Sequence, residues 1–167
     1  MLIGILAALM TRSSTRATRL LADAGVSFTL HTYAYDPNAD RVGLQAAEAL
    51  GEAPDRVLKT LMAWVDRTAV CVIVPSDREV SMKKLAAVFR GKAAQMMKPA
   101  DAERMTGYRV GGISPFGQMR RVPTAMDEQC LAHELVYMNA GQRGLQVRLN
   151  PRDAVQALAA LVVPIVA

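Results

Sequence analysis

The stretch LMAWVDRTAVCVIVP, residues 61–75, contains two apolar runs that are separated by three polar residues. Leu61–Val65 and Ala69–Pro75 have the composition of strands, and the short polar DRT between them predicts a β-hairpin. A second hairpin is predicted where ELVYMNAG and RGLQVRLN flank residues 141–144. Because a hairpin pairs its strands antiparallel, two hairpins exclude a strictly parallel sheet.

Helical segments surround these hairpins. Ser81 is a typical N-cap for the helix MKKLAAVFRG, which Gly91 closes. The alternation in VSFTLHTY predicts a further strand at Val26–Tyr33. The sequence therefore predicts a single α/β domain of the mixed α+β class, in which helices surround a mixed, largely antiparallel sheet. The other expected helices run from Ser13 or Ser14 to about Ala24, over Gly43–Leu50, over Pro99–Thr106, and from Asn150 through Leu161.

The composition is that of one globular domain: 167 residues, 51% apolar and 21% charged. At this length folding buries roughly 70% of the unfolded surface, so neither a disulfide nor a metal is required. The cysteines Cys71 and Cys130 and the histidines His31 and His133 lack the spacing of a zinc site. We therefore expect no metal and no cofactor, and two isolated cysteines favour a reducing, cytoplasmic setting.

The first ten residues, MLIGILAALM, are apolar and uncharged. They are too few to span a bilayer, which takes about 20 residues, and they lack the positive segment that begins a secretory signal. Because Met10 reads as a natural start, we expect residues 1–12 to be an extension or the product of an alternative start, and residues 13–167 to form the domain. A helix extension and a dimer contact are the alternatives, and no membrane association is expected.

Basic residues are concentrated between Arg78 and Arg121. This segment has ten basic and three acidic residues, a net charge of +7, whereas the rest of the chain has ten basic and twelve acidic residues, a net charge of −2. Such a segment suits a polyanionic partner, and a solvated basic face is the alternative. Aromatic residues make up only 5% of the chain, which argues against base-stacking platforms and favours phosphate contacts.

The most informative loop is TGYRVGGISPFG, residues 106–117. Its four glycines allow successive backbone N–H groups to point into one cavity, which suits a carbonyl oxygen, an oxyanion or a phosphate. The spacing is neither that of a dinucleotide fingerprint nor that of a P-loop. An ordinary tight loop is the alternative interpretation.

Lys59 is the second candidate site residue, with an apolar neighbour before it and a strand-like run after it. A lysine in this position either points into a pocket or extends from a strand edge into solvent. Ser114 is a weak candidate nucleophile, because neither histidine lies in a motif that would support a serine triad. Cys71, within an apolar strand, and Cys130, close to acidic residues, are expected to be non-catalytic.

Several of these motifs occur in one order and spacing: HTYAYDP, LKTL, VPSDREVSMKKLA, TGYRVGGISPFGQMRRVPT and AGQRGL. In this combination the chain resembles the YbaK/EbsC family of aminoacyl-tRNA deacylases, from about Thr15 to Leu161. It is most similar to the free-standing members that clear cysteine from mischarged proline tRNA. The same fold is inserted in many bacterial prolyl-tRNA synthetases as an editing domain that removes alanine. The resemblance implies that fold, the 3′ acceptor end of an aminoacyl-tRNA as partner, and prolyl-tRNA synthetase as a further partner.

The resemblance also implies roles for individual residues. Lys59 matches the family's essential lysine, which contacts the terminal adenosine or the ester region, and Tyr33 matches a pocket aromatic. Enzymes of the cysteine type use no protein nucleophile, because the substrate's own thiol attacks the ester carbonyl and leaves as a thiolactone. The protein then needs only to position and polarise the substrate. Backbone groups that would hold the terminal adenosine and the aminoacyl carbonyl belong to Gly111, Gly112, Ile113, Ser114 and Pro115.

Three positions depart from the cysteine-specific pattern. Val42 replaces a phenylalanine, Asn139 a serine and Gln146 an aspartate, and the last two fall where the polar groups of the pocket are expected. We therefore expect a deacylase whose amino acid, cysteine or another small one such as alanine, stays open. A non-catalytic module that binds a tRNA end or a synthetase is disfavoured because Lys59 and GGISP are both present. The basic segment disfavours a hydrolase of small esters or amides.

Overall fold

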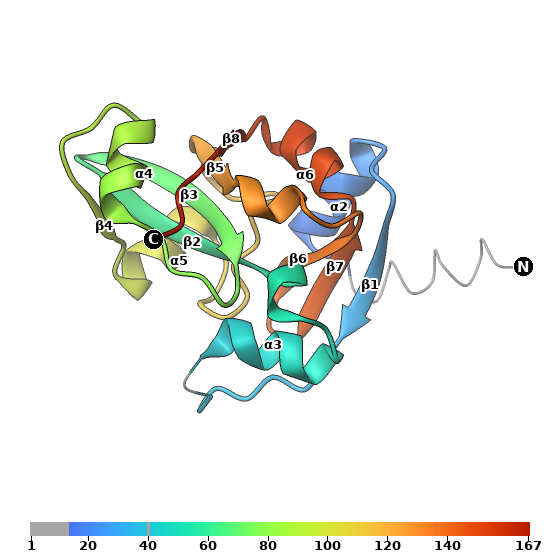
Figure 1. The fold of residues 1–167 in the computed structure, drawn as a ribbon. Helices are drawn as coiled ribbons and strands as arrows, with labels where there is room; N and C mark the ends of the chain where they lie inside the picture. The colour runs from blue at the N-terminus through green and yellow to red at the C-terminus, as the bar shows by residue number, and fades with distance from the viewer. Residues whose placement is uncertain (1–13, 40) are drawn as a thin grey trace, which may run out of the picture.

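The computed structural model describes residues 14–39 and 41–167, so the predicted extension at residues 1–12 lies outside the described residues. The chain forms two sheets with helices around them, which confirms the predicted mixed α+β class (Figure 1). The larger sheet consists, in order, of β4 (Ala94–Met96), β2 (Leu58–Val65), β3 (Thr68–Pro75), β5 (Thr124–Asp127) and β8 (Leu161–Val163). The smaller sheet consists, in order, of β1 (Phe28–Thr32), β7 (Leu145–Leu149) and β6 (Val136–Gln142).

The hairpin predicted at residues 61–75 is confirmed and forms the centre of the larger sheet. β2 and β3 pair antiparallel from Leu58 opposite Pro75 to the turn, where Asp66 adopts a left-handed conformation with φ 52°. Beyond β3, the pairs β3–β5 and β5–β8 are parallel, so the sheet is mixed. β4 pairs only with the last three residues of β2, Ala63–Val65. The first part of β2 therefore has no strand of the described chain along this edge.

The second predicted hairpin is also confirmed, as β6 and β7 of an antiparallel sheet. β1 adds to the other edge of β7, with Phe28 opposite Leu149. The pairing of β6 with β7 shifts between Asn139 and Gln142, and Gly141 in this bulge has φ 91°. The two sheets meet where Val57, just before β2, bridges to Tyr137 in β6.

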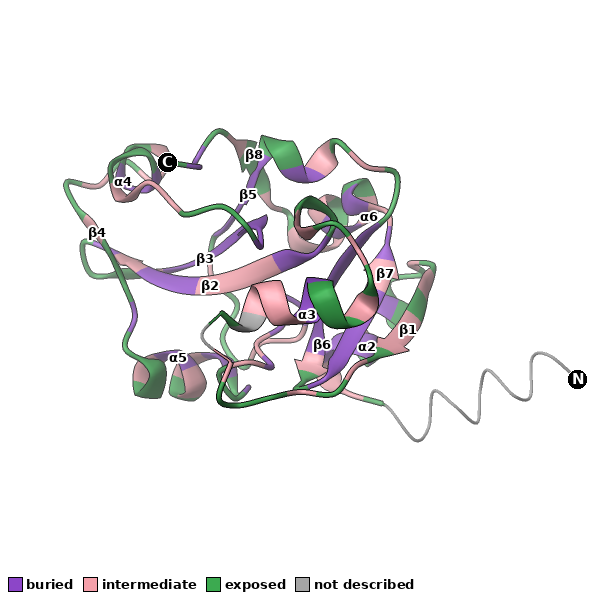
Figure 2. Cartoon of the chain, turned by 60° about the horizontal axis from the view of Figure 1, so that its bottom comes forward, coloured by how far each residue is buried: buried purple, intermediate pink, exposed green. Residues whose placement is uncertain are grey.

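The helices are short and lie at the periphery. Figure 2 shows the consequence for burial: exposed residues on the outer faces of the helices and buried residues along β3 and β7. None of the described helices is long and apolar enough to cross a membrane. The α-helices are α2 (Arg16–Asp23), α3 (Val42–Leu50), α4 (Met82–Val88), α5 (Pro99–Thr106) and α6 (Pro151–Leu158), and the 3₁₀ helices are η1 (Pro54–Arg56) and η2 (Glu128–Leu131).

The cap of α2 differs from the prediction. Of the two expected caps, Ser13 lies outside the described residues and Ser14 precedes the helix without capping it. The N-cap is Thr15, whose side chain accepts a hydrogen bond from the Thr18 N–H, while the Thr18 hydroxyl accepts one from the Thr15 N–H. This reciprocal arrangement satisfies two backbone donors at once and therefore fixes the start of the helix.

Two helix ends were also predicted wrongly. α4 stops before Gly91, and the left-handed residue that follows it is Arg90, with φ 57°. α6 was expected to continue through Leu161, but Ala159 takes φ 50° and the chain turns into β8. The β-branched residues of β8 pair in parallel with β5, and this tertiary pairing prevails over the local preference of an alanine-rich segment for helix.

Candidate active site

A cavity of about 370 Å³ lies where the two sheets meet. The uncovered edge of β2 forms one wall, the first turns of α3 and the glycine-rich loop form others, and Asn139 and Gln146 of the smaller sheet contribute polar groups. This volume is within the range of small-ligand sites. The walls are mainly apolar, with the side chains of Leu44, Leu61, Met62, Met96, Met97 and Ile113.

Lys59, near the start of β2, lines this cavity with a side chain that is 20% exposed. Its Nζ lies 3.5 Å from Oε1 of Glu79, which follows β3. Gly43 in the first turn of α3 faces it, because a Cβ at Gly43 would lie 3.7 Å from the Lys59 Cβ and 3.2 Å from the Ser76 Cβ. The small residue at position 43 therefore allows α3 to approach β2 beside the lysine.

The glycine-rich loop contributes Gly111 and Ile113 to the same cavity. Gly111 has φ 89°, and a Cβ there would lie 2.4 Å from the Tyr35 hydroxyl oxygen, so only glycine fits this backbone without strain. The Asn139 Nδ2 donates a hydrogen bond to the Gly111 carbonyl at 3.1 Å, and its Oδ1 accepts one from the Gly141 N–H at 2.8 Å. Both ends of the Asn139 amide thus hold the loop against the bulge of β6.

The other predicted loop residues do not line this cavity. Gly112 packs against the β6–β7 turn, where an added Cβ would lie 2.9 Å from the Arg143 backbone nitrogen. Ser114 is fully buried, and its hydroxyl accepts a hydrogen bond from the Phe116 N–H. Pro115 borders a separate, smaller cavity. The loop therefore divides into a part that faces the site and a part that shapes the loop.

Two predicted polar residues, Tyr33 and Gln146, also line the cavity. Burial raises the pKa of the Tyr33 hydroxyl, and hydrogen bonding from the Gln146 side chain opposes the rise. Gln146 is only 3% exposed and lies opposite Asn139 in the β6–β7 register. Within the described part of the chain, its Oε1 has no hydrogen-bond partner, and neither has the Oγ1 of Thr60, which also lines the cavity. Such buried acceptors are available to a ligand.

Sequence reasoning missed Thr60 and Glu79. Thr60 directly follows Lys59 in the LKTL motif, and this position beside a candidate residue could have identified it. Glu79 lies in the segment that connects the end of β3 to the cap of α4, a place where functional residues are common. Val42 is the third position that departs from the cysteine-specific pattern, and its side chain lies outside the described part of the structure.

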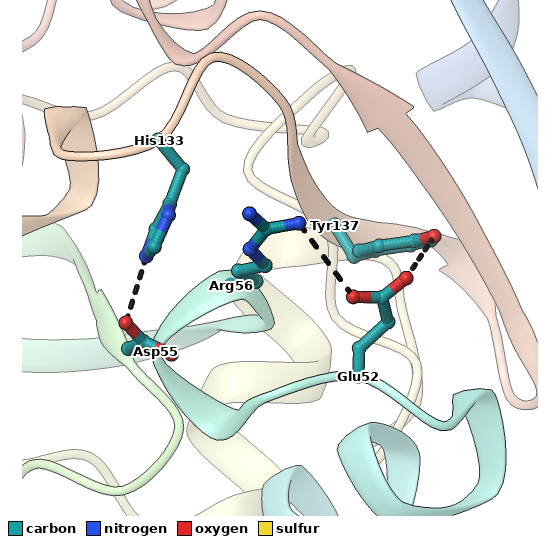
Figure 3. Close-up of polar contacts among 5 residues, drawn as sticks. All are labelled: Glu52, Asp55, Arg56, His133 and Tyr137. Carbon is teal, nitrogen blue, oxygen red and sulfur yellow. Dashed lines mark hydrogen bonds and ion pairs between the residues drawn. The ribbon is translucent and has the colours of Figure 1, made fainter.

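The cysteines and histidines do not line the cavity. Burial raises the pKa of the Cys71 thiol to about 12 and also raises the pKa of the Cys130 thiol well above its ordinary value. Both therefore remain protonated at neutral pH, as expected of non-catalytic residues. His31 packs edge-on against the Tyr137 ring, and His133 Nε2 lies 2.7 Å from the Asp55 carboxylate (Figure 3).

The contacts in Figure 3 support the wall of the cavity. The Tyr137 hydroxyl donates a hydrogen bond to Glu52 at 3.0 Å, and the same carboxylate lies 4.0 Å from Arg56. The Tyr137–Glu52 contact thus joins the segment after α3 to β6, and the Asp55–His133 contact joins η1 to the segment before β6. Among residues 14–39 and 41–167, no group of three or more histidine, cysteine or acidic side chains could hold a metal ion.

The sequence pattern of the aminoacyl-tRNA editing domain matches residues 36–157 of this chain. The chain is 32% identical over 143 residues to the EbsC protein of Enterococcus faecalis, named for Cys-tRNA(Pro)/Cys-tRNA(Cys) deacylase activity, with 84% of this chain and 86% of that protein covered. It is 27% identical over 109 residues to a proline–tRNA ligase of Desulforamulus reducens, of which it covers 19%. The chain therefore belongs to the aminoacyl-tRNA editing domain family.

Two solved structures share the fold. One is described as a trans-editing enzyme for prolyl-tRNA synthetase, with a TM-score of 0.77, 21% identity, and coverage of 91% of this chain and 95% of that one. The other is a protein designated APE2540, with a TM-score of 0.80, 20% identity, and coverage of 92% and 100%. These matches and the observed sheets agree with the predicted editing-domain fold.

Proposed function

We propose that this protein is a trans-editing aminoacyl-tRNA deacylase that removes a mischarged amino acid from tRNA, with cysteine on proline tRNA as the first candidate. One observation carries the proposal: in a chain of the editing family, Lys59 and the loop residues Gly111 and Ile113 border the same cavity. A non-catalytic binding module would not require an ammonium group beside a glycine-rich loop within one cavity. The similarity to EbsC supports the choice of cysteine.

In this proposal each cavity residue has a distinct task. The Lys59 ammonium polarises the ester region or binds the terminal adenosine, and Gly111 and Ile113 position the aminoacyl carbonyl. Asn139 acts through Gly111, because both ends of its amide are already engaged with the backbone. Tyr33 and Gln146 face the amino acid. Gly112, Ser114 and Pro115 maintain the conformation of the loop.

With cysteine as the amino acid, the chemistry needs no nucleophile from the protein. The substrate's sulfur attacks its own ester carbonyl, the bond from that carbonyl to the ribose oxygen breaks, and the thiol proton passes to that oxygen. The products are a thiolactone and an uncharged tRNA. The protein contributes orientation and a positive charge near the developing oxyanion, the two effects that this cavity offers.

The basic segment is proposed to bind the tRNA backbone. Three of its basic residues, Arg78, Lys98 and Arg109, directly precede the cavity-lining residues Glu79, Pro99 and Val110 in the sequence. Affinity for tRNA should fall as salt rises, with a logarithmic slope of about −0.7 to −0.9 per phosphate contacted. We further propose that prolyl-tRNA synthetase delivers the substrate, and that residues 13–167 suffice for activity.

The test is a deacylation assay with a panel of mischarged tRNAs, including Cys-tRNA(Pro) and Ala-tRNA(Pro), followed by identification of the released product. Release of a thiolactone from the cysteinyl substrate supports the first candidate. Alanine is the second candidate, because the cavity wall is mainly apolar; having no thiol, alanine would be released as the free amino acid by water. No deacylation of any charged tRNA would contradict the proposed function.

A further inference from the structure

The charged side chains at the cavity are few. Among its described lining residues, Arg41 and Lys59 are basic, and Glu79 is the only carboxylate. The two nearest polar residues of the smaller sheet, Asn139 and Gln146, are neutral amides. Any cationic group that enters this cavity therefore meets one partner of opposite charge, and that partner is Glu79.

The backbone around Glu79 is fixed although its side chain is 74% exposed. The Ala167 N–H donates a hydrogen bond to the Glu79 carbonyl at 2.8 Å, and the next residue, Val80, forms an antiparallel bridge with Val166. The C-terminal segment is itself held by the buried Asp127, whose Oδ2 accepts hydrogen bonds from two of its backbone N–H groups. This chain of contacts fixes the Glu79 backbone beside the cavity, and the ion pair with Lys59 places its carboxylate.

An aminoacyl ester carries a cation of its own, the α-ammonium group. Burying an ammonium without a partner is costly, so a site for such an ester needs a carboxylate or several acceptors. Gln146 and Thr60 each offer a neutral acceptor, while the Asn139 amide is engaged with the backbone. A carboxylate has about four acceptor positions, so Glu79 can hold Lys59 at 3.5 Å and still receive a second cation.

We propose that Glu79 binds the α-ammonium group of the substrate and is a determinant of specificity for α-amino acyl groups. This inference rests on the proposed deacylase function. Because the Glu79 side chain is largely exposed, solvent screening limits its contact with an ammonium to roughly a factor of two to five in binding. The competing explanation is that Glu79 acts only on Lys59 as a positioning residue.

The two explanations differ in how they depend on the substrate's charge. The experiment compares wild type and Glu79→Gln in single-turnover deacylation of two tRNAs. One carries an amino acid that the wild type removes, and the other carries the corresponding α-hydroxy acid, in which a hydroxyl replaces the ammonium. Glu134→Gln is the matched control, because Glu134 is an exposed carboxylate outside the cavity. Thermal unfolding of each variant establishes that it is folded.

We expect Glu79→Gln to raise the half-saturating enzyme concentration about two- to fivefold for the aminoacyl substrate and to leave it unchanged for the hydroxyacyl substrate. Glu134→Gln should match the wild type on both. Equal losses on the two substrates would overturn the inference and assign Glu79 to Lys59 alone, and no loss on either would also overturn it. If the wild type deacylates no charged tRNA, the proposed function itself fails, and this inference fails with it.

Discussion

Replacing Lys59 by alanine should separate catalysis from folding. The Lys59 side chain borders a cavity instead of filling the core, so its removal leaves no new void in a packed cluster. Its ion pair joins it to Glu79, which is 74% exposed, and solvent screening limits such a pair to about 0.2–1 kcal/mol. We therefore expect Lys59→Ala to lower the free energy of unfolding by less than about 1 kcal/mol.

The loss of activity should be much larger. Removing one preorganised donor from the place where negative charge develops lowers the rate by about 10²–10³, or roughly 3–4 kcal/mol in the activation free energy. Lys59→Arg should also be slow, because a planar guanidinium does not reproduce a compact ammonium in a site narrowed by the approach of α3 at Gly43. tRNA affinity should fall only modestly, since one of many basic residues is lost.

The assay is single-turnover deacylation at saturating enzyme, which reports the chemical step without binding or product release. Lys83→Ala, in the first turn of α4, is the matched control: it removes the same charge from an exposed position and should leave the saturated rate within about twofold. If Lys59→Ala also stays within twofold of the wild type, Lys59 has no part in the mechanism and is a lysine that extends into solvent.

Three further substitutions probe the loop, the pocket and the support of the Glu79 segment. Gly111→Ala should lower stability by about 1–2 kcal/mol and slow deacylation, because φ 89° and the Tyr35 hydroxyl both oppose a side chain; thermal unfolding and single-turnover rates test this. Gln146→Asp should change the amino-acid profile while it reduces stability through a buried charge; an unchanged profile would refute its pocket role. Asp127→Ala should lower the free energy of unfolding by about 3 kcal/mol or more in denaturant titrations, since three backbone N–H groups lose a charged acceptor; a loss below about 1 kcal/mol would contradict this.

The hairpins were predictable because each consists of long apolar runs on either side of a short turn. The sequence did not predict β4, β5 and β8, which are three or four residues long and owe their existence to pairing with strands distant in the chain. The helix start after Ser81 was predictable from its serine cap and the start at Pro99 from a proline at the first helical position. The helix end at Ala159 depends on a left-handed backbone conformation that alanine rarely adopts.

Site residues that belong to a sequence motif were predictable, whereas those that only the fold brings to the cavity were not. The motifs pointed to Lys59 and the glycine-rich loop, and both lie at the cavity. Gly111 faces the site, whereas Ser114 points into the protein interior. This difference depends on the local path of the backbone and could not be predicted from the residue types. Glu79 was missed because an exposed acidic residue in a connecting segment resembles any other until its distance to Lys59 is known.

The cavity at the junction of two sheets takes its Lys59–Glu79 ion pair and its two neutral amides from different parts of the fold. Lys59 and Glu79 belong to the larger sheet and the segment that follows it, whereas Asn139 and Gln146 lie opposite each other in the smaller sheet. The sheets are joined at the bridge of Val57, which precedes β2, and by the contacts of α3 with β6. Substitutions in β6 and β7 can therefore alter the pocket without displacing the lysine. This arrangement accounts for a chain that keeps the lysine and loop of the deacylase pattern while departing from it at both positions of the smaller sheet.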